Sequence, residues 1–456
     1  MHFVHRPYQK EETIAAVTTP AGEGAIAVIR ISGSKAFEIS EALFSGPVRS
    51  YMTHTAHYGN ILNRDGTVLD SVLLLVMKGP RSYTGEDTVE ISCHGGSLMT
   101  RRVLERVFEA GARPAEPGEF SFRAFLNGKL DLAQAEAVQS LIAAKSERAL
   151  ENAGMQLQGN LSEKISSFQR ELTELSAILE AWVDFPEEGL EFATMEEIAS
   201  SLEAICRKME KLASTFHDGK VLHEGLSLCL LGAPNVGKSS LMNALLGKER
   251  AIVTPIAGTT RDLLEENLRI GGLHFRLIDT AGIRDTEEMI EQEGIRRSKK
   301  AMQEADLILL LLDAARKIEE KDHALLSEVP REKTILVWNK IDLSQPQESF
   351  PFPTVSISAK EKQGLDDLKE AIERLIWKQG PPPKDEVALT QHRHHQALAH
   401  AIAHCKNVIA GLKQNLSAEF VTADLRASLS ELGTILGTNV GEDILTAIFS
   451  KFCLGK

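Results

Sequence analysis

The sequence has few of the features that mark secreted, metal-binding or membrane proteins. Its 456 residues include five cysteines, whose positions fit neither disulfide pairing nor zinc-ligand spacing. The longest apolar runs, such as Leu307–Leu312, are far too short to span a bilayer, and residues 1–6 lack the apolar core of a signal peptide. We therefore expect a cytoplasmic protein with reduced thiols and no membrane association.

Excess positive charge is also missing. The net charge is -13 and the pI is about 5.6, so broad nonspecific attraction to nucleic acid is not expected, although a local basic groove is compatible with these values. A chain of this length predicts about three domains, each with its own apolar core.

The middle of the chain carries a phosphate-binding loop, Gly-Ala-Pro-Asn-Val-Gly-Lys-Ser-Ser, at residues 232–240. It follows the apolar run Leu226–Leu231, which predicts a buried strand, and precedes Leu241–Leu246, which predicts a helix. In this context Lys238 reaches the β- and γ-phosphates, and the Ser239 hydroxyl can bind magnesium. The predicted nucleotide contacts here are Asn235, Val236, Gly237, Lys238, Ser239 and Ser240.

Two later segments indicate which base is bound. The strand predicted at Thr334–Trp338 is followed by Asn339, Lys340 and Asp342, and the aspartate can accept hydrogen bonds from guanine N1 and its exocyclic amine. Adenine offers no such pair of donors, so the pattern favours GTP over ATP. The strand predicted at 354–357 leads into Ser358, Ala359 and Lys360, which resemble the backbone clamp on guanine O6 in GTPases.

Two further segments fall between these in the order that a GTPase needs. The strand predicted at Leu273–Ile278 leads into Asp279, Thr280, Ala281 and Gly282, where Asp279 can hold the magnesium shell and the Gly282 N–H can sense a γ-phosphate. Upstream, residues 258–262 offer a threonine for magnesium, with Thr260 favoured. An ordinary turn is an equal alternative for either segment taken alone.

The residue after Gly282 is Ile283, where GTPases of the Ras type have a glutamine that orients the attacking water. The hydrocarbon side chain of Ile283 cannot do so. One of the carboxylates in 285–291 is expected to do so, while the others form a solvated loop. An arginine finger is not obvious either. The Asn235 amide oxygen could help to hold a monovalent cation beside the phosphates, a role that a lone asparagine does not establish.

The flanking segments differ from this module and from each other. Residues 10–125 mix predicted strands (Ala25–Ile31, Val72–Met77 and Val89–Cys93) with helices near 34–43 and 97–110, which indicates an α+β domain. Long amphipathic helix is predicted from Leu130 to Val183, then to about Phe216, and again after 380–383. The GTPase module thus interrupts one helical domain, entering near residue 222 and leaving near 380.

Two C-terminal features are ambiguous. Five histidines at 392–404 and Cys405 invite a metal interpretation, but without a carboxylate at a useful place a polar helical surface explains them more simply. The final residues, 451–456, have the composition of a frayed tail.

Several sequence blocks resemble one family over the whole chain. They are Thr84–Asp87, His94–Gly96, Pro117–Phe120, Ala124–Asn127, Lys129–Ala137, Asp184–Pro186 and the terminal Cys-Leu-Gly-Lys. Together with the GTPase motifs, they are similar to the MnmE (TrmE) family of tRNA uridine-modification GTPases. This resemblance also gives the tail a function, against the interpretation from composition.

The resemblance implies a multidomain fold. It consists of an N-terminal α+β folate-binding-like and dimerisation domain at 1–127, a discontinuous all-α helical domain at 128–222 and 380–456, and an inserted α/β Ras-like P-loop GTPase domain at 223–379. It also implies a homodimer that acts on tRNA with MnmG (GidA), in a heterotetramer or larger complex. Flavin and NADH belong to that partner, and the one-carbon unit comes from 5,10-methylene- or 5-formyl-tetrahydrofolate.

Site residues carried over from the family fall on matching positions. Folate contacts fall on Arg30, Glu90, Lys129 and Lys456. The catalytic residues are Glu291, Lys238 and the tail Cys453. Potassium falls on Asn235, Thr254, Ile256 and Thr259, and the nucleotide-binding loop on Thr254, Pro255, Ile256, Ala257, Gly258, Thr259 and Thr260. Pro255 has no N–H donor, but the loop uses carbonyls, so little is lost.

The predicted function is a potassium-stimulated GTPase that adds an aminomethyl or carboxymethylaminomethyl group to C5 of the wobble uridine, with hydrolysis opening and closing the dimer. One alternative is a ribosome-assembly-type GTPase that binds RNA and modifies nothing. Another is a folate-dependent aminomethyltransferase whose GTPase is merely regulatory.

Overall fold

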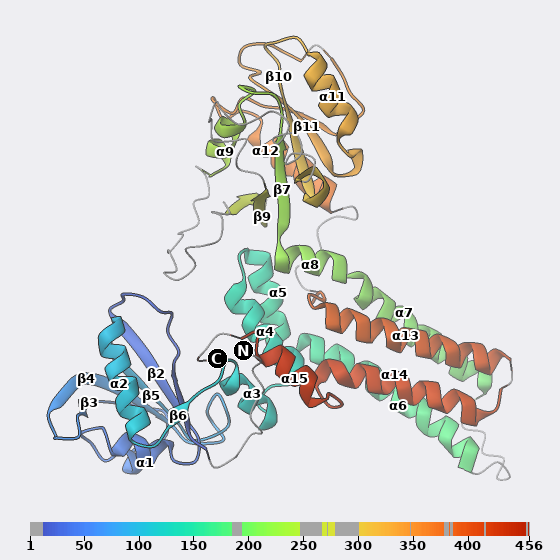
Figure 1. Cartoon of the computed structure of the whole chain (residues 1–456). Coiled ribbons are helices and arrows are strands. Elements are labelled where there is room, and N and C mark those ends of the chain that lie inside the picture. The colour runs from blue at the N-terminus through green and yellow to red at the C-terminus, as the bar shows by residue number, and fades with distance from the viewer. Residues whose placement is uncertain are drawn as a thin grey trace.

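The computed structural model describes residues 12–184, 194–246, 267–270, 272–278, 301–346, 348–377, 383, 386–414, 416–452 and 455. These ranges form an N-terminal α+β domain, a bundle of long helices and an α/β module, which are seen as three bodies in Figure 1. Within these ranges, no helix combines the length and the apolar character needed to cross a membrane.

The N-terminal domain is built on one six-stranded sheet in the order β3-β4-β5-β2-β1-β6, antiparallel except for β1 beside β6. Its strands are β1 (Ile14–Val17), β2 (Ile26–Ser32), β3 (Thr55–Leu62), β4 (Val68–Met77), β5 (Thr88–His94) and β6 (Arg113–Pro114). Helices α1 (Ala36–Glu41) and α2 (Ser97–Glu109) and the short η1 (Val48–Ser50) accompany it. Alternate side chains such as Ile29, Val89 and Ile91 form the core with α1 and α2.

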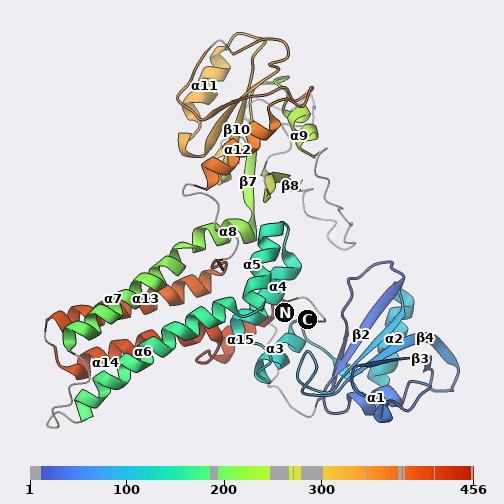
Figure 2. The ribbon, with the colours of Figure 1, turned by 180° about the vertical axis from the view of Figure 1, so that it is seen from behind.

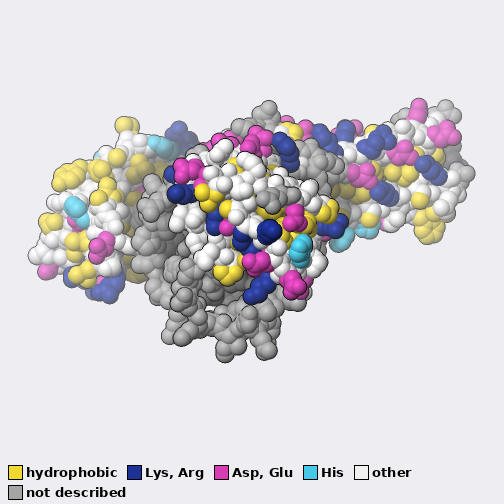
Figure 3. Space-filling view, turned by 90° about the horizontal axis from the view of Figure 1, so that it is seen from above, with side chains coloured by type: hydrophobic (Ala, Val, Ile, Leu, Met, Phe, Trp, Pro, Cys, Tyr) yellow, Lys and Arg dark blue, Asp and Glu magenta, His cyan; other side chains and the backbone are white. Residues whose placement is uncertain are grey.

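The other face of this sheet is only partly covered. Helix α3 (Glu119–Leu126) places Phe120 against Ile14 and Ala16. Farther along the sheet, Tyr58 and Leu73 are neighbours in register and are 77% and 51% exposed. Figure 3 shows exposed hydrophobic side chains at the end of this domain that lies away from the helical bundle, interspersed with charged ones.

The helical domain combines segments from before and after the α/β module. Helices α6 (Asn160–Asp184), α7 (Met195–Ser214), α13 (His392–Lys413) and α14 (Ala418–Leu436) pack around one apolar core. Helices α4 (Leu132–Ala143), α5 (Glu147–Leu157) and α15 (Glu442–Phe449) lie at the end of the bundle near the N-terminal domain (Figure 1). Cationic and acidic side chains are interspersed along the bundle in Figure 3.

The helix predicted from Leu130 to Val183 is in fact three helices. Helix α4 ends at Ala143, and the Ser146 side chain accepts a hydrogen bond from the Ala149 N–H at the start of α5. Gly159 separates α5 from α6 with φ +93°, which an L side chain rarely adopts. The apolar periodicity continues across both breaks because all three helices bury a face, so it did not reveal them.

The α/β module enters the chain through α8 (Phe216–Glu224), which leads directly into its central strand β7 (Leu226–Leu231), as Figure 2 shows. The sheet order is β12-β11-β10-β7-β9-β8, parallel except for β8. The other strands are β8 (Asn267–Ile270), β9 (Leu273–Ile278), β10 (Leu307–Asp313), β11 (Thr334–Asn339) and β12 (Thr354–Ser356). The helices described are α9 (Lys238–Leu246), α11 (Glu320–Glu328), η3 (Arg331–Lys333) and α12 (Leu365–Ile376).

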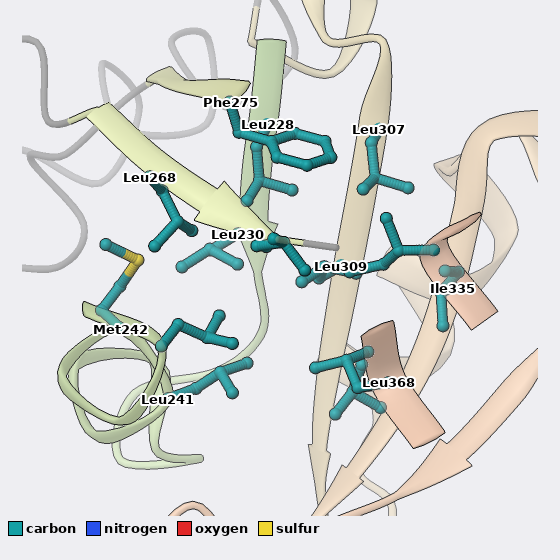
Figure 4. Packing of buried hydrophobic residues seen from close by; sticks show 14 of the residues in the cluster. Leu228, Leu230, Leu241, Met242, Leu268, Phe275, Leu307, Leu309, Ile335 and Leu368 are labelled. Atoms are coloured by element: carbon teal, nitrogen blue, oxygen red, sulfur yellow. The ribbon is translucent and has the colours of Figure 1, made fainter. Parts of the chain in front are cut away.

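Both faces of this sheet are buried. Leucines of β7 and β10 pack with residues of α9 and α12 on one face (Figure 4), and residues of α11 and 301–305 cover the other. All side chains of β7 and β10 are buried, which explains why these strands read as continuous apolar runs in the sequence.

The C-terminal segment is packed against the rest of the protein. Phe449 and Phe452 are 0% and 4% exposed, in a cluster with Leu132 of α4 and phenylalanines of α3. The Gln139 amide donates to the Lys451 carbonyl, and Gly455 lies against Val17 of β1. A frayed tail, expected from composition alone, is therefore wrong for these described residues.

The histidine cluster is not a polar surface throughout. His394 is 0% exposed, and its Nε2 lies 2.6 Å from Glu136 Oε2 of α4. His404 pairs with Asp424 of α14 at 2.8 Å. Carboxylates thus come from other helices, which the local sequence could not reveal. Among the described residues, no group of three or more potential metal ligands is found.

Candidate nucleotide site and N-terminal site

The loops that carry the GTPase motifs meet at one edge of the α/β sheet. Strands β7, β10 and β11 are parallel neighbours, so their carboxyl ends lie side by side. Strand β7 lies between β9, the next parallel strand along the chain, and β10. The order of the strands therefore reverses at β7, and open α/β sheets bind ligands at such a switch point.

The phosphate loop joins β7 to the N-terminus of α9. Asn235 and Gly237 have φ of +62° and +101°, and a Cβ on Gly237 would lie 2.1 Å from Asn339 Nδ2. Only glycine therefore fits at 237. The Lys238 ammonium donates to the carbonyls of Gly232 and Ala233, at 2.9 and 3.1 Å, so the lysine lies along the loop. Ser239 lies in the first turn of α9, where helix N–H groups favour an anion.

Asn339 joins the phosphate loop to the guanine side of the site. Its side chain is buried, its Nδ2 donates to the Val236 carbonyl at 2.8 Å, and its Oδ1 accepts from the Ala359 N–H at 3.0 Å. The first asparagine of the guanine motif therefore fixes two loops that are far apart in sequence. Its physical task is to hold the site together.

The remaining guanine residues surround this bridge. Asp342 is exposed in the turn after β11, and within the described ranges its carboxylate makes no hydrogen bond, so it is available to a ligand. Ser358 is buried and its hydroxyl accepts from the Glu361 N–H at 3.1 Å, while Lys360 is exposed. Lys340 has φ +66° and turns its side chain toward β10.

One residue of this site was missed at the sequence level. Asp313 ends β10 beside Asn339 in register, and its Oδ2 lies 2.6 Å from the Lys340 ammonium. The sequence signal was an acidic residue at the end of an otherwise apolar strand. That signal indicates a role in this site only once the strand order is known, because β10 lies beside β11.

Several predicted residues lie outside the described ranges. They are Thr254, Pro255, Ile256, Ala257, Gly258, Thr259, Thr260, Asp279, Thr280, Ala281, Gly282, Glu291, Cys453 and Lys456. Of the predicted metal ligands, Ser239 and Asn235 are described. Both residues lie within the phosphate loop and carry oxygen donors of the kind that magnesium and potassium bind. Their chemistry therefore fits these ions.

Comparison with known proteins agrees with this architecture. The family described as "GTP-binding protein TrmE N-terminus" matches residues 13–129, and that described as "MnmE helical domain" matches residues 132–453. The chain is 61% identical to the tRNA modification GTPase MnmE of Protochlamydia amoebophila, with both chains covered in full. It belongs to the MnmE family.

More distant MnmE proteins match nearly as completely. The chain is 41% identical to the MnmE of Clostridioides difficile and 42% identical to that of Geobacter sulfurreducens, and each match covers 98% of this chain and 99% of the relative. These matches confirm the predicted multidomain fold, in which a P-loop GTPase domain accompanies an N-terminal α+β domain and a helical domain.

The folate residues expected from the MnmE resemblance can now be located. Arg30 and Glu90 are neighbours in register on β2 and β5, and the Arg30 Nε donates to the Glu90 carboxylate at 2.8 Å. The Arg30 guanidinium also lies 5.0 Å from the Tyr83 ring centre and 5.4 Å from that of Phe120. Burial raises the pKa of Tyr83, although its hydrogen bond to Ser121 opposes this.

Lys129 follows helix α3 and lies against the loop that carries Tyr83. Its ammonium donates to the Pro80 carbonyl at 3.1 Å, and its stem packs beside Gly85. The tail approaches the same domain from the helical side, because Gly455 contacts Val17 of β1, the strand next to Arg30. Three of the four predicted folate residues, Arg30, Glu90 and Lys129, thus border one sheet and one loop. The fourth, Lys456, is outside the described ranges, but its neighbour Gly455 lies against the same sheet.

A buried ion network supports that loop. Arg123 of α3 is fully buried and pairs with Glu86 at 3.1 Å and Glu119 at 3.0 Å, while the Ser32 hydroxyl donates to Glu86 at 2.8 Å. Glu119 also binds Arg113 at 2.6 Å. Burial alone would raise the pKa of Glu119, but Arg113 and Arg123 lower it, so this carboxylate is ionised at neutral pH.

Proposed function

We propose that the chain is a potassium-stimulated GTPase that modifies tRNA. With a flavin-dependent partner, it adds an aminomethyl or carboxymethylaminomethyl group to C5 of the wobble uridine, using a tetrahydrofolate one-carbon unit. The observation that carries this proposal is the phosphate loop joined through Asn339 to the 358–360 loop, within a chain that matches an MnmE protein over its whole length.

The GTPase part rests on described contacts. Asn339 holds the phosphate loop against the 358–360 loop, and Asp342 is exposed beside them. Ser239, in the first turn of α9, would help to hold a magnesium ion, which would supply charge stabilisation at the phosphates. The Lys238 ammonium, which donates to carbonyls of its own loop, is the cation that we assign to the β- and γ-phosphate oxygens.

For hydrolysis we propose Glu291 as the group that orients the water, and potassium at Asn235 in place of an arginine finger. Asn235 supports its part in this because it lies within the phosphate loop and carries an amide oxygen, a donor of the kind that potassium binds. Glu291→Ala should bind GTP normally and hydrolyse it more slowly, and an unchanged rate would show that another group orients the water. Stimulation by sodium equal to that by potassium would contradict the cation assignment.

The N-terminal domain is proposed to bind tetrahydrofolate. Glu90 can accept from the pterin amine and N–H, while Arg30, Lys129 and the terminal Lys456 supply cations for the folate glutamate or the tail. Titration of 5-formyl-tetrahydrofolate should show weaker binding by Lys129→Ala. Lys35→Ala, an exposed lysine elsewhere in the same domain, is the control. Unaltered affinity in Lys129→Ala would remove this site.

We further propose that the chain forms a homodimer through the N-terminal domain. The exposed pair of Tyr58 and Leu73 on its sheet supports this, since an apolar sheet face needs a cover. Leu73→Asp should shift the sedimentation coefficient toward the monomer. Leu343→Asp changes a residue of the GTPase module that is 70% exposed and should leave the dimer intact. Equal behaviour of the two variants would contradict this interface.

Nucleotide-dependent movement of the dimer needs a path from the GTPase module to the helical domain. Ser140 of α4 and His223 of α8 are hydrogen-bonded at 3.2 Å. Burial, with the nearby charge of Lys145, lowers the pKa of His274 to about 4, so this histidine is neutral at the junction. Because His274 of β9 lies against Gly225, which directly follows α8, a displacement of β9 would act on α8 and on its hydrogen bond to α4.

Reconstitution tests the whole proposal. The chain, a flavin-dependent partner, tetrahydrofolate, GTP, potassium and tRNA should together yield the modified wobble uridine in tRNA hydrolysates. Omission of GTP or of the chain should abolish the product. Wobble nucleosides that are unchanged in a strain lacking the chain would instead favour a GTPase that binds RNA without modifying it.

A further inference from the structure

Asp313 forms an ion pair whose position relates it to base recognition. It is the last residue of β10, it is 9% exposed, and its Oδ2 lies 2.6 Å from the Lys340 ammonium. Its other oxygen accepts from the Ala315 N–H at 2.9 Å, which fixes the carboxylate. The N–H of Ala314, between these two residues, donates to the Asn339 carbonyl at 2.9 Å. This hydrogen bond holds the ends of β10 and β11 together.

The pairing matters because a second carboxylate lies close by. Asp342 is only two residues beyond Lys340 in the same turn, is exposed, and makes no side-chain hydrogen bond within the described ranges. An ammonium on a flexible four-carbon stem that was not held elsewhere would be attracted to it. The Asp342 carboxylate would then be occupied before a base arrived.

We propose that Asp313 is a specificity-determining positioning residue of the guanine site. It holds the Lys340 ammonium away from Asp342, so that this carboxylate stays available for guanine N1 and the exocyclic amine. The pair also fixes the lysine stem before the base binds, which removes part of the ordering cost. The inference deepens the proposed GTP binding and depends on it.

The test compares a base that has the amine with one that lacks it. Binding of GDP and of IDP to the full-length chain is measured by calorimetry at fixed magnesium. In Asp313→Asn we expect GDP binding to weaken by about tenfold and IDP binding by less, so that the GDP-to-IDP preference shrinks. At saturating GTP, kcat should stay within about twofold, because the interaction acts on base binding and not on the transition state.

A matched control separates positioning from general stability. Asp322 is 1% exposed and pairs with Arg316 at 2.9 Å in the same module, at the start of α11. Asp322→Asn should therefore destabilise the module comparably while leaving the GDP-to-IDP preference unchanged. If both variants reduce the preference equally, or if Asp313→Asn weakens GDP and IDP binding by the same factor, the proposal is overturned.

Lys340→Met gives a second test that does not depend on Asp313→Asn folding. It removes the competing ammonium but keeps an unbranched stem, so the preference for GDP should persist, and Asp313→Asn in this background should change it no further. Loss of the preference in Lys340→Met would show that the ammonium itself recognises guanine, which overturns the inference. Failure of the unaltered chain to bind GDP would refute the proposed GTPase function instead.

Discussion

Replacement of Asn339 by alanine should remove the side chain that joins the phosphate loop to the 358–360 loop. The side chain is 2% exposed and makes two hydrogen bonds, to the Val236 carbonyl at 2.8 Å and from the Ala359 N–H at 3.0 Å. Because Val236 and Ala359 are themselves buried, neither backbone group regains a good partner in water. Each buried group left unsatisfied costs about 1 to 3 kcal/mol, so the sum is about 2 to 6 kcal/mol.

That sum is a large share of the stability of one domain, which is about 5 to 15 kcal/mol. We therefore expect Asn339→Ala to melt the GTPase module at a lower temperature and to bind GDP at least about tenfold more weakly. Calorimetry on the full chain gives both quantities, since the module and the helical domain need not unfold together.

Asn152 offers a matched control in another domain. It is 4% exposed, and its amide donates to the Ala388 carbonyl at 3.2 Å and accepts from the Ala388 N–H at 2.9 Å. Asn152→Ala should destabilise the helical domain, chiefly through the Ala388 N–H because the Ala388 carbonyl also accepts from Gln156 at 2.7 Å, and it should leave GDP affinity unchanged. If Asn339→Ala binds GDP as tightly as the unaltered chain, the bridge between the two loops is not what holds the site.

Three further predictions test other parts of the chain. Burial alone would raise the pKa of Glu136, but the charges of His394 and Arg393 outweigh it and hold the pKa at about 2, so about 3 kcal/mol of stability should be lost as pH falls from about 4.5 toward 2. Glu136→Gln should remove that pH dependence in acid unfolding. Asp342→Asn should bind GDP more weakly and XDP more tightly, because an amide can donate to the xanthine carbonyl. Phe452→Ala should destabilise the helical domain by about 3 to 5 kcal/mol in thermal unfolding, because the ring is 4% exposed.

Each of these predictions has an outcome that contradicts it. Acid unfolding with the same pH dependence in Glu136→Gln would mean that other carboxylates dominate. An Asp342→Asn variant that gains no affinity for XDP would place that side chain away from the base. For the tail, Phe420→Ala is the control because its ring is 72% exposed, and equal melting of the two variants would mean that the packing of Phe452 contributes nothing.

The GTPase strands could be predicted from the sequence because burial on both faces leaves a continuous apolar signal. Leu226–Leu231, which is buried throughout, has the predicted bounds, and so does Leu273–Ile278, although the exposed Arg276 interrupts its apolar run. In the N-terminal domain, the short β1 and β6 and the half-exposed β3 lack such a signal, and they were not predicted. Helix positions were predicted better than helix ends, because the apolar periodicity continues across the residues where one helix ends and the next begins.

The site was predictable to the extent that its residues form local motifs. Asn235–Ser240 and Asn339–Asp342 each have a spacing that a ligand dictates, so the sequence alone indicates phosphate and guanine binding. Contacts between distant segments leave no such spacing. His394 and its partner Glu136 are 258 positions apart, and nothing in the histidine cluster indicated a carboxylate on α4.

Motif residues and supporting residues also differ in how they act. We propose that Asp342 and Lys238 contact the nucleotide, so changing either residue should alter binding or catalysis directly. Asp313 only holds Lys340, and Asn339 only joins two loops, so each acts through the position of another group. If that distinction is correct, replacing Asp313 should change base preference with little effect on kcat, whereas replacing Lys238 should change kcat with little effect on base preference. Measuring both quantities in both variants decides whether recognition of the base and catalysis at the phosphates are separately supported in this site.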